Sequence, residues 1–373
     1  MKKFQRQLLG LSQLSLLLCL LSSGLAFADT PQVSSPTHTV DLNAKDEALI
    51  NQLVTAGIQP LYRELGQASQ QLTQSSETFC KTTTLDNLQK LREAWGTTLL
   101  AWQRTDALLF GPATAEQMDF HINFFPPKKQ IIKSLLDSTI PLTTASLAEA
   151  GVGAQGLSTL EYLLFDRELS TEQVLTTFSA NQGLMRCSYL QAASHLLEEN
   201  IKKITTPWLK GEATQQFASN QQVIDLLIGK AYQTLARINL KKLSLPLGLN
   251  DEKHQSHPYE LEAWRSGYAF KIIQANAEGI RRVFKEGGFL AWIDQSFPNE
   301  ATKIAVASFE KQLQELAAMQ LPADDPFNLV EQNTEFPART ELVGRCRSLE
   351  MSLKRQLAVI TKAQLGFNDS DGD

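Results

Sequence analysis

Three polar residues on two predicted helices have the types and spacing to bind a cation or a polar ligand. Ser158 and Glu161 lie three apart in GLSTLEYLLF, so on a helix they share one face, one turn apart. Asp106 falls on the apolar stripe of another helix, after Leu99 and Trp102. Burying an unpaired carboxylate there would cost several kcal/mol, so Asp106 must be paired, hydrogen-bonded or bound to a cation. Two carboxylates that meet at one end of a bundle suit a hard cation or a polar ligand.

Both carboxylates also have a purely structural interpretation. Glu161 borders the stripe of Leu157 and Leu164, where its side chain could instead reach water or a lysine. Asp106 could lie just beyond the bundle, because FGP (110–112) stops its helix. The residues alone leave these alternatives open.

The glycines of GVGAQG, which precede Ser158, have the G-x-G-x-x-G spacing of a dinucleotide-binding turn. That turn needs a strand before it and a crossover to a parallel strand after it. The upstream segment LLDSTIPLTTASLAEA has a helical pattern, and no strand pattern follows. We therefore interpret these glycines as a turn that leads into a helix starting near Gly156.

The residues favour binding over catalysis. A zinc peptidase needs about three protein ligands, an open coordination position and a general base. The chain has no H-E-x-x-H motif. Of its five histidines, His121 in HINFFPP is the best candidate, because this segment could fold back over the end of the Asp106 helix. Ser158 would need a neighbouring base to act as a nucleophile, and the sequence provides none.

The elements that must position these residues are helices. Apolar residues recur at steps of three and four through most of the chain, as in Leu88, Leu91, Trp95, Leu99 and Trp102. We predict an all-α fold of two consecutive antiparallel bundles, each of about four long helices. The predicted boundaries are a disordered leader at 29–44, bundles at 45–208 and 213–365, and a disordered tail at 366–373.

The first twenty-eight residues have the three parts of a secretory signal peptide. Lys2, Lys3 and Arg6 form a basic start, residues 14–21 an apolar core, and the letters AFA a cleavage site that ends at Ala28. No later stretch approaches eighteen apolar residues, so we do not expect an integral membrane protein.

Cleavage after Ala28 would leave 32 Lys+Arg (35 minus 3) against 40 Asp+Glu, a formal charge of −8. This balance argues against nucleic acid as a partner. Three cysteines would remain, which allows one disulfide and one thiol. Cys80 and Cys187 fall in the same predicted bundle, so we favour that pair and expect Cys346 to be free.

Several segments resemble the imelysin-like family of bacterial exported proteins. They are WQRTDALLFGP (102–112), FFPP, GLSTLEYLLF (156–165), RCSYLQA and SGYAFKIIQANAEGI. The resemblance covers nearly the whole mature chain. It implies two four-helix bundles, a periplasmic or outer-membrane location and an association with iron uptake. The chain is also similar to the periplasmic component of a ferrous-iron uptake system, and the family is often filed with the metallopeptidases.

The family's motif is G-x-H-x-x-E, and here Gly156 and Glu161 match it, whereas Ser158 replaces the histidine. An imidazole and a carboxylate three apart on a helix can both face one transition-metal ion. A serine hydroxyl is a weak, neutral ligand for such an ion. The replacement therefore argues against both metal binding and peptidase activity.

These inferences predict a periplasmic, non-catalytic binding protein implicated in iron or metal acquisition, with a polar site at the end of the N-terminal bundle, near the domain interface, where Asp106, Ser158 and Glu161 converge. The expected cofactor is iron or another divalent metal, or none because of Ser158. The partner would be a metal ion or a small ligand. The alternatives are a metallopeptidase and a structural partner of an outer-membrane receptor. We expect Asp106 and Glu161 to be the metal ligands of a site formed by Trp102, Arg104, Asp106, His121, Gly156, Ser158 and Glu161.

Overall fold

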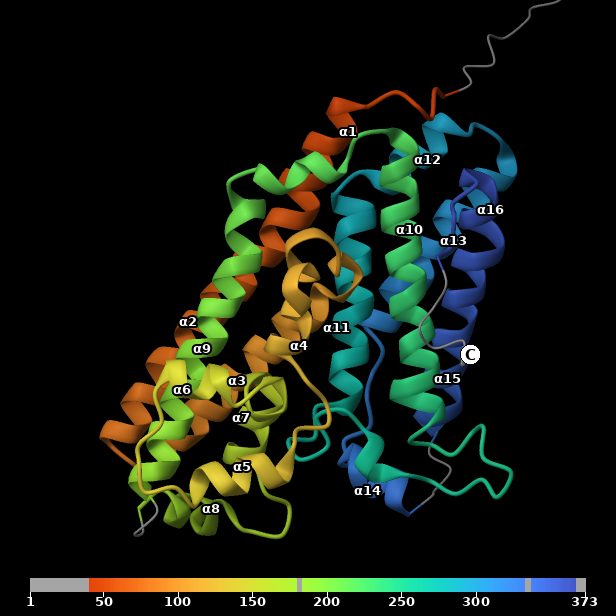
Figure 1. Ribbon diagram of the computed structural model, residues 1–373. Helices are drawn as coiled ribbons and strands as arrows, with labels where there is room; N and C mark the ends of the chain where they lie inside the picture. Colours follow the sequence, from red (N-terminus) through yellow and green to blue (C-terminus); the bar gives the residue numbers. More distant parts are fainter. Residues whose placement is uncertain (1–39, 180–182, 333–336, 367–373) are drawn as a thin grey trace, which may run out of the picture. The chain divides into compact units, whose positions relative to one another are not determined.

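The secondary structure of the described residues consists of helices and turns without a strand, which confirms the all-α prediction. The computed structural model describes residues 40–179, 183–332 and 337–366, and these ranges pack into one compact unit (Figure 1).

Parts of three predicted segments lie outside this description. They are the signal peptide at 1–28, the leader as far as residue 39, and the tail from residue 367. Within the described ranges, no helix is long and apolar enough to cross a membrane.

The α-helices range from four to 27 residues. The first half of the chain contains α1 (Glu47–Gln52), α2 (Gln59–Lys81), α3 (Leu85–Arg104), α4 (Met118–Ile122), α5 (Lys129–Leu136), α6 (Thr144–Glu149), α7 (Gly156–Leu164), α8 (Thr171–Thr177) and α9 (Gly183–Leu209). The second half contains α10 (Asn220–Arg237), α11 (Ala269–Arg281), α12 (Phe289–Ser296), α13 (Glu300–Ala317), α14 (Pro326–Glu331), α15 (Pro337–Ser352) and α16 (Ala358–Thr361).

Three long helices, α2, α3 and α9, frame the first half, and α2 packs along both of the others. The short helix α7 packs against both α3 and α9. Helix α3 begins where the Thr84 side chain accepts a hydrogen bond from the Asn87 amide, a cap that satisfies one of the free donors of the first turn. Pro60 lies in the first turn of α2, directly after a π-helix at Leu53–Ile58.

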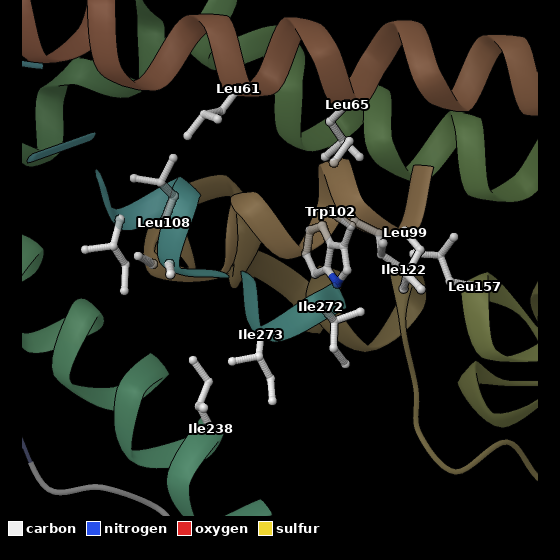
Figure 2. Close-up of a cluster of buried hydrophobic side chains, with 14 of the residues drawn as sticks. Leu61, Leu65, Leu99, Trp102, Leu108, Ile122, Leu157, Ile238, Ile272 and Ile273 are labelled. Carbon is white, nitrogen blue, oxygen red and sulfur yellow. The ribbon is translucent and has the colours of Figure 1, made fainter. Parts of the chain in front are cut away.

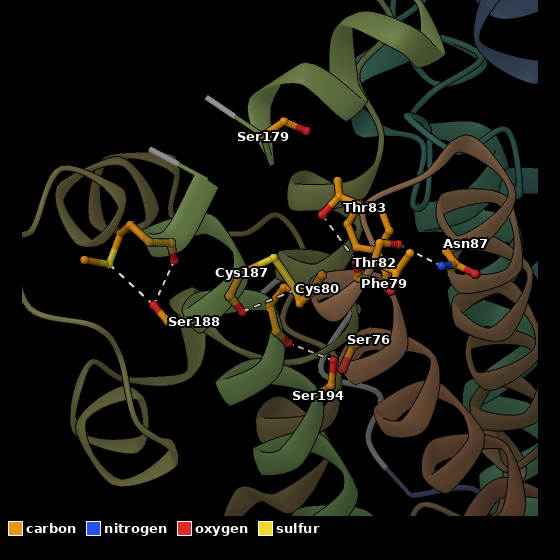
Figure 3. Close-up of a disulfide and its surroundings, with 12 residues drawn as sticks. Ser76, Phe79, Cys80, Thr82, Thr83, Asn87, Ser179, Cys187, Ser188 and Ser194 are labelled. Carbon is orange, nitrogen blue, oxygen red and sulfur yellow. Dashed lines mark hydrogen bonds between the residues drawn. A yellow bond between two sulfur atoms is a disulfide. The ribbon is translucent and has the colours of Figure 1, made fainter. Parts of the chain in front are cut away.

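A disulfide joins the C-terminal end of α2 to the start of α9. Cys80 and Cys187 form this bond, with their Cα atoms 5.6 Å apart (Figure 3). Cys346 of α15 is a free, buried thiol, and burial raises its pKa to about 12.

Four longer helices, α10, α11, α13 and α15, frame the second half. Helix α13 packs against α11 and α15, and α15 packs against α10. Helix α10 continues without a break into a π-helix, η7 (Ile238–Ser244), which carries the buried Lys242.

The two halves share one apolar core. Figure 2 shows Trp102 of α3 in a buried cluster with Leu65 of α2, Ile238 of η7, and Ile272 and Ile273 of α11. Helix α11 lies so close to the end of α3 that a Cβ atom at Gly279 would collide with the carbonyl oxygen of Arg104. This contact fixes the end of α3, where the site residues lie, against the second half.

Candidate functional site

Gly156 sets the start of α7 directly on the end of α4. Its φ of +78° is a conformation that side chains rarely adopt, and a Cβ atom would collide with the carbonyl oxygen of Ile122. Because α7 begins there, the buried Ser158 faces Asn123, the residue that follows α4. Its hydroxyl donates a hydrogen bond to Oδ1 of Asn123 at 2.8 Å.

Glu161, one turn further along α7, is buried and bound to a loop of the second half. Its Oε1 accepts hydrogen bonds from the Ser266 backbone amide at 2.9 Å and the Ser266 hydroxyl at 2.8 Å. Burial raises the pKa of Glu161, and the bonds from Ser266 offset only part of that rise. The Ser266 hydroxyl oxygen also lies 3.0 Å from the carbonyl oxygen of Ala263, a second acceptor for the same proton, and the φ of +57° at Ala263 marks a strained turn.

The carboxylate of Glu262, in the same loop, accepts hydrogen bonds from two side chains and forms an ion pair with a third, each from a different element. Asn123 donates to its Oε1 at 2.8 Å and Gln103 of α3 at 2.7 Å. The Lys242 ammonium lies 3.3 Å from its Oε2. Lys242 also donates to Gln103 at 2.7 Å and to Asn276 of α11 at 2.9 Å. A continuous chain of polar contacts therefore connects the two halves, and Ser158 joins it through Asn123.

Asp106 lies beyond α3, in a short 3₁₀ turn (Asp106–Leu108), and binds a cation of the second half. Arg237, the last residue of α10, donates to its Oδ2 at 2.8 Å. Burial disfavours the carboxylate, but the charges of Arg237 and Lys242, together with side-chain hydrogen bonds such as that from Arg237, outweigh this and lower the pKa of Asp106. Asp106 is therefore an ionised partner of Arg237.

A cavity of about 430 Å³ opens between these groups, a volume typical of small-molecule sites. Its walls come from the end of α3, α4 and the loop after it, the end of α10 with η7, and the loop around Glu262. The lining residues are Trp102, Gln103, Asp106, Leu109, Asp119, Phe120, Asn123, Phe124, Phe125, Pro126, Arg237, Lys241, Lys242, Leu245, Glu260 and Glu262.

The structure does not bring the predicted site residues to one point. Asp106 is bound to Arg237, Glu161 to Ser266 and Ser158 to Asn123. Within the described ranges, no three His, Cys, Asp or Glu side chains are grouped closely enough to hold a metal ion. This arrangement does not fit a resident transition metal, because such ions need several converging donors.

The remaining predicted residues divide between the cavity and its surroundings. Trp102 is buried and lines the cavity. Arg104, which we expected to line or orient the site, points instead towards Glu64, at 4.0 Å. His121 does not line the cavity, and its backbone carbonyl packs against Gly156.

Sequence reasoning missed the polar residues that do meet. Gln103 follows Leu99 by four, Lys242 follows Ile238 by four, and Asn276 follows Ile272 by four, so each polar residue extends an apolar stripe. The same signal identified Asp106, and it would have identified these three. Asn123, Glu262 and Ser266 lie outside the regular α-helices, where no periodicity marks them.

Known proteins resemble this chain in sequence and in fold. An iron-regulated protein A from Synechococcus elongatus is 28% identical over 98 residues, which make up 26% of this chain and 26% of that protein. Thus the alignment spans about a quarter of that relative.

Two solved structures share the fold. One is an imelysin-like protein from Psychrobacter arcticum (TM-score 0.67, 20% identity, 87% of this chain and 99% of that chain). The other is an iron-regulated protein A precursor from Parabacteroides distasonis (TM-score 0.66, 15% identity, 84% and 94%). The family model described as Imelysin (Peptidase_M75) matches residues 58–350. Since this match covers well over half of the sequence, the chain belongs to the imelysin family.

Proposed function

We propose that this protein is an exported, periplasmic and non-catalytic binding protein of iron acquisition, and that its ligand binds in the cavity beside Asn123 and Glu262. Export is supported by the signal-peptide pattern that ends at Ala28. A role connected with iron is supported by family membership and by the names of the iron-regulated relatives.

One observation carries the proposal for the site. The cavity lies at the meeting of both halves, and two of the carboxylates that line it already have cationic partners in the chain. Glu262 has Lys242, and Asp106 has Arg237. Displacing these partners to coordinate a bare ion would leave buried cations unpaired, which is costly. The site is therefore better suited to a small organic ligand or a metal chelate than to a naked metal ion.

The geometry gives peptidase chemistry no comparable support. The Ser158 hydroxyl is hydrogen-bonded to an amide oxygen, which is no base for activating it. The Glu161 carboxyl group is already hydrogen-bonded to Ser266, so it is not placed to act as a general base on a substrate. We propose that a structural role in holding the halves together accompanies ligand binding, because the same polar chain performs it.

Calorimetric titration of the mature protein tests this function. The probes are ferrous sulfate, zinc sulfate, ferric citrate and a ferric hydroxamate chelate with a pendant ammonium arm. We expect at least one chelate to bind stoichiometrically and the simple salts to bind at least tenfold more weakly.

Two variants locate the binding. Leu109→Trp should fill the cavity and abolish chelate binding, whereas Leu85→Trp, at an exposed position on α3, should not. Tight binding of a simple salt that Glu161→Gln abolishes would instead establish a metal-ion site. Chelator-sensitive proteolysis that Glu161→Ala abolishes would establish a peptidase.

A further inference from the structure

The charged groups deep in the cavity do not balance. Three carboxylates, those of Asp106, Asp119 and Glu262, face two cations, Arg237 and Lys242. Each cation already has a carboxylate: Arg237 lies 2.8 Å from Asp106, and Lys242 lies 3.3 Å from Glu262. One negative charge, that of Asp119, is therefore left over.

Asp119 has no ion-pair partner within the described ranges. Its side chain is half-buried on α4, and burial raises its pKa, an effect that hydrogen bonds from its own amide and that of Phe120 offset only in part. Arg237 and Lys230 lower the pKa of Asp119 through longer-range attraction, without forming an ion pair with it. A carboxylate held in this way gains free energy when a cation binds beside it.

The rim adds no net charge. Lys241 and Glu260 both line the mouth of the cavity, and both are exposed to water. Their opposite charges cancel, so together they leave the charge of Asp119 uncompensated. The excess of one negative charge therefore persists for the cavity as a whole.

The wall beside Asp119 is aromatic. Phe120, which is 45% exposed, forms a ring pair with Phe124 at 6.1 Å. The Lys128 ammonium already lies over the Phe124 ring at 5.6 Å, so this wall accepts an ammonium group. Exposed aromatic rings beside an unpaired carboxylate favour a ligand that is apolar over most of its surface and positive at one end.

We infer that the cavity binds an organic cation, in which an ammonium group pairs with Asp119 and an apolar body packs against Phe120, Phe124 and Trp102. This inference rests on the proposal that the cavity holds the protein's ligand, and it specifies the chemistry of the part that enters. A metal chelate that carries a pendant amine would bind in this way, with its ammonium group paired with Asp119.

Three probes of similar shape and different charge test the inference: 2-phenylethylamine, 2-phenylethanol and 3-phenylpropionate. Dissociation constants at pH 7 are measured by ligand-observed NMR on the mature wild type, on Asp119→Asn and on Glu116→Gln. Glu116 is a matched control, because it is an exposed carboxylate three residues away that does not line the cavity.

We expect the wild type to bind the amine at least tenfold more tightly than the alcohol, and the propionate most weakly. Asp119→Asn should remove the preference for the amine and leave the affinity for the alcohol unchanged, because only the charge is lost. Glu116→Gln should behave as the wild type does. Folding of each variant is checked by its thermal midpoint.

Three results would overturn the inference: equal binding of amine and alcohol, preferred binding of the propionate, or a preference for the amine that survives in Asp119→Asn. If the alcohol or the propionate binds at least as tightly as the amine and Leu109→Trp abolishes that binding, the preference for a cation is wrong, while the cavity remains the binding site. If no probe binds, the inference fails, and the chelate titration decides the proposed function separately.

Discussion

The Ser158 hydroxyl donates to the Asn123 side chain, and the Asn123 amide in turn donates to Glu262. Ser158, which replaces the histidine of the G-x-H-x-x-E motif, thus takes part in the polar chain between the two halves. The serine is small enough to be enclosed there, with 5% of its surface exposed. Ser158 therefore has a structural partner in this protein, the Asn123 side chain.

Ser158→His restores the motif residue, and we expect it to destabilise the protein without creating a metal site. The larger ring must fit a closed space, which costs about 1–3 kcal/mol. Glu161 stays engaged with Ser266 and is not free to join the imidazole. Urea denaturation and elemental analysis after incubation with ferrous iron or zinc check both parts. If the variant binds metal stoichiometrically and the wild type does not, the expectation that no metal site forms is wrong.

Glu161→Gln should change how stability depends on pH. Burial raises the pKa of Glu161 in the folded state, so between the unfolded value, about 4.3, and the folded value the native state binds more protons than the unfolded state. Stability therefore falls as pH rises through this window, and the penalty persists above it. We expect the glutamine variant to lose less stability than the wild type from about pH 4 upward.

Denaturation midpoints measured from pH 4 to pH 8 would show this difference. Glu116→Gln, at an exposed position, is the control and should follow the wild type. Parallel pH profiles for wild type and Glu161→Gln would mean that the carboxyl ionises normally in the folded protein.

Lys242→Met should be strongly destabilising, by about 3–5 kcal/mol, because it leaves Glu262 without its cation in the polar chain. The double variant Lys242→Met/Glu262→Gln should recover much of this loss, because no unpaired charge remains. Chemical denaturation of the wild type, both single variants and the double variant gives the coupling energy. Additive effects would show that Glu262 does not depend on Lys242.

Removal of the disulfide should lower stability by about 2–4 kcal/mol, because the bond closes a loop with a sequence separation of 107 residues. Cys80→Ser/Cys187→Ser can be compared with wild type under oxidising conditions by thermal and urea denaturation. Thiol titration provides an independent check. The native wild type should react slowly, because Cys346 is buried and its pKa is raised to about 12, and the denatured protein should show one thiol.

The helices could be predicted from the sequence because their apolar stripes are long and regular. The residues that meet in the cavity could be predicted only where they interrupt such a stripe, as Asp106 does. Its partner, Arg237, could not be predicted, because contacts between residues 131 apart depend on how α10 packs. Asp119 is also invisible to periodicity, because α4 has only five residues.

The predicted convergence of Asp106 with Glu161 illustrates the same limit. Glu161 lies on α7 as the stripe predicts, whereas Asp106 lies beyond the end of α3, the alternative that the sequence left open. A stripe specifies only that a side chain faces the interior. Which interior neighbour it meets depends on local features such as the left-handed Gly156 and the close approach of Gly279 to Arg104. A pattern within one helix does not encode these features.

The shared core around Trp102 has a consequence for how the chain behaves as a thermodynamic system. A fragment that ends at Gly211 would lose Ile238, Ile272 and Ile273 from the apolar cluster that contains Trp102, so neither half should melt as an independent cooperative unit. A molecule bound in the cavity would therefore raise the melting temperature of the entire chain, by an amount set by its concentration relative to its dissociation constant. Calorimetric melting should then give one transition. The shift of its midpoint on addition of a ligand would measure how much of the cavity is occupied, without any label.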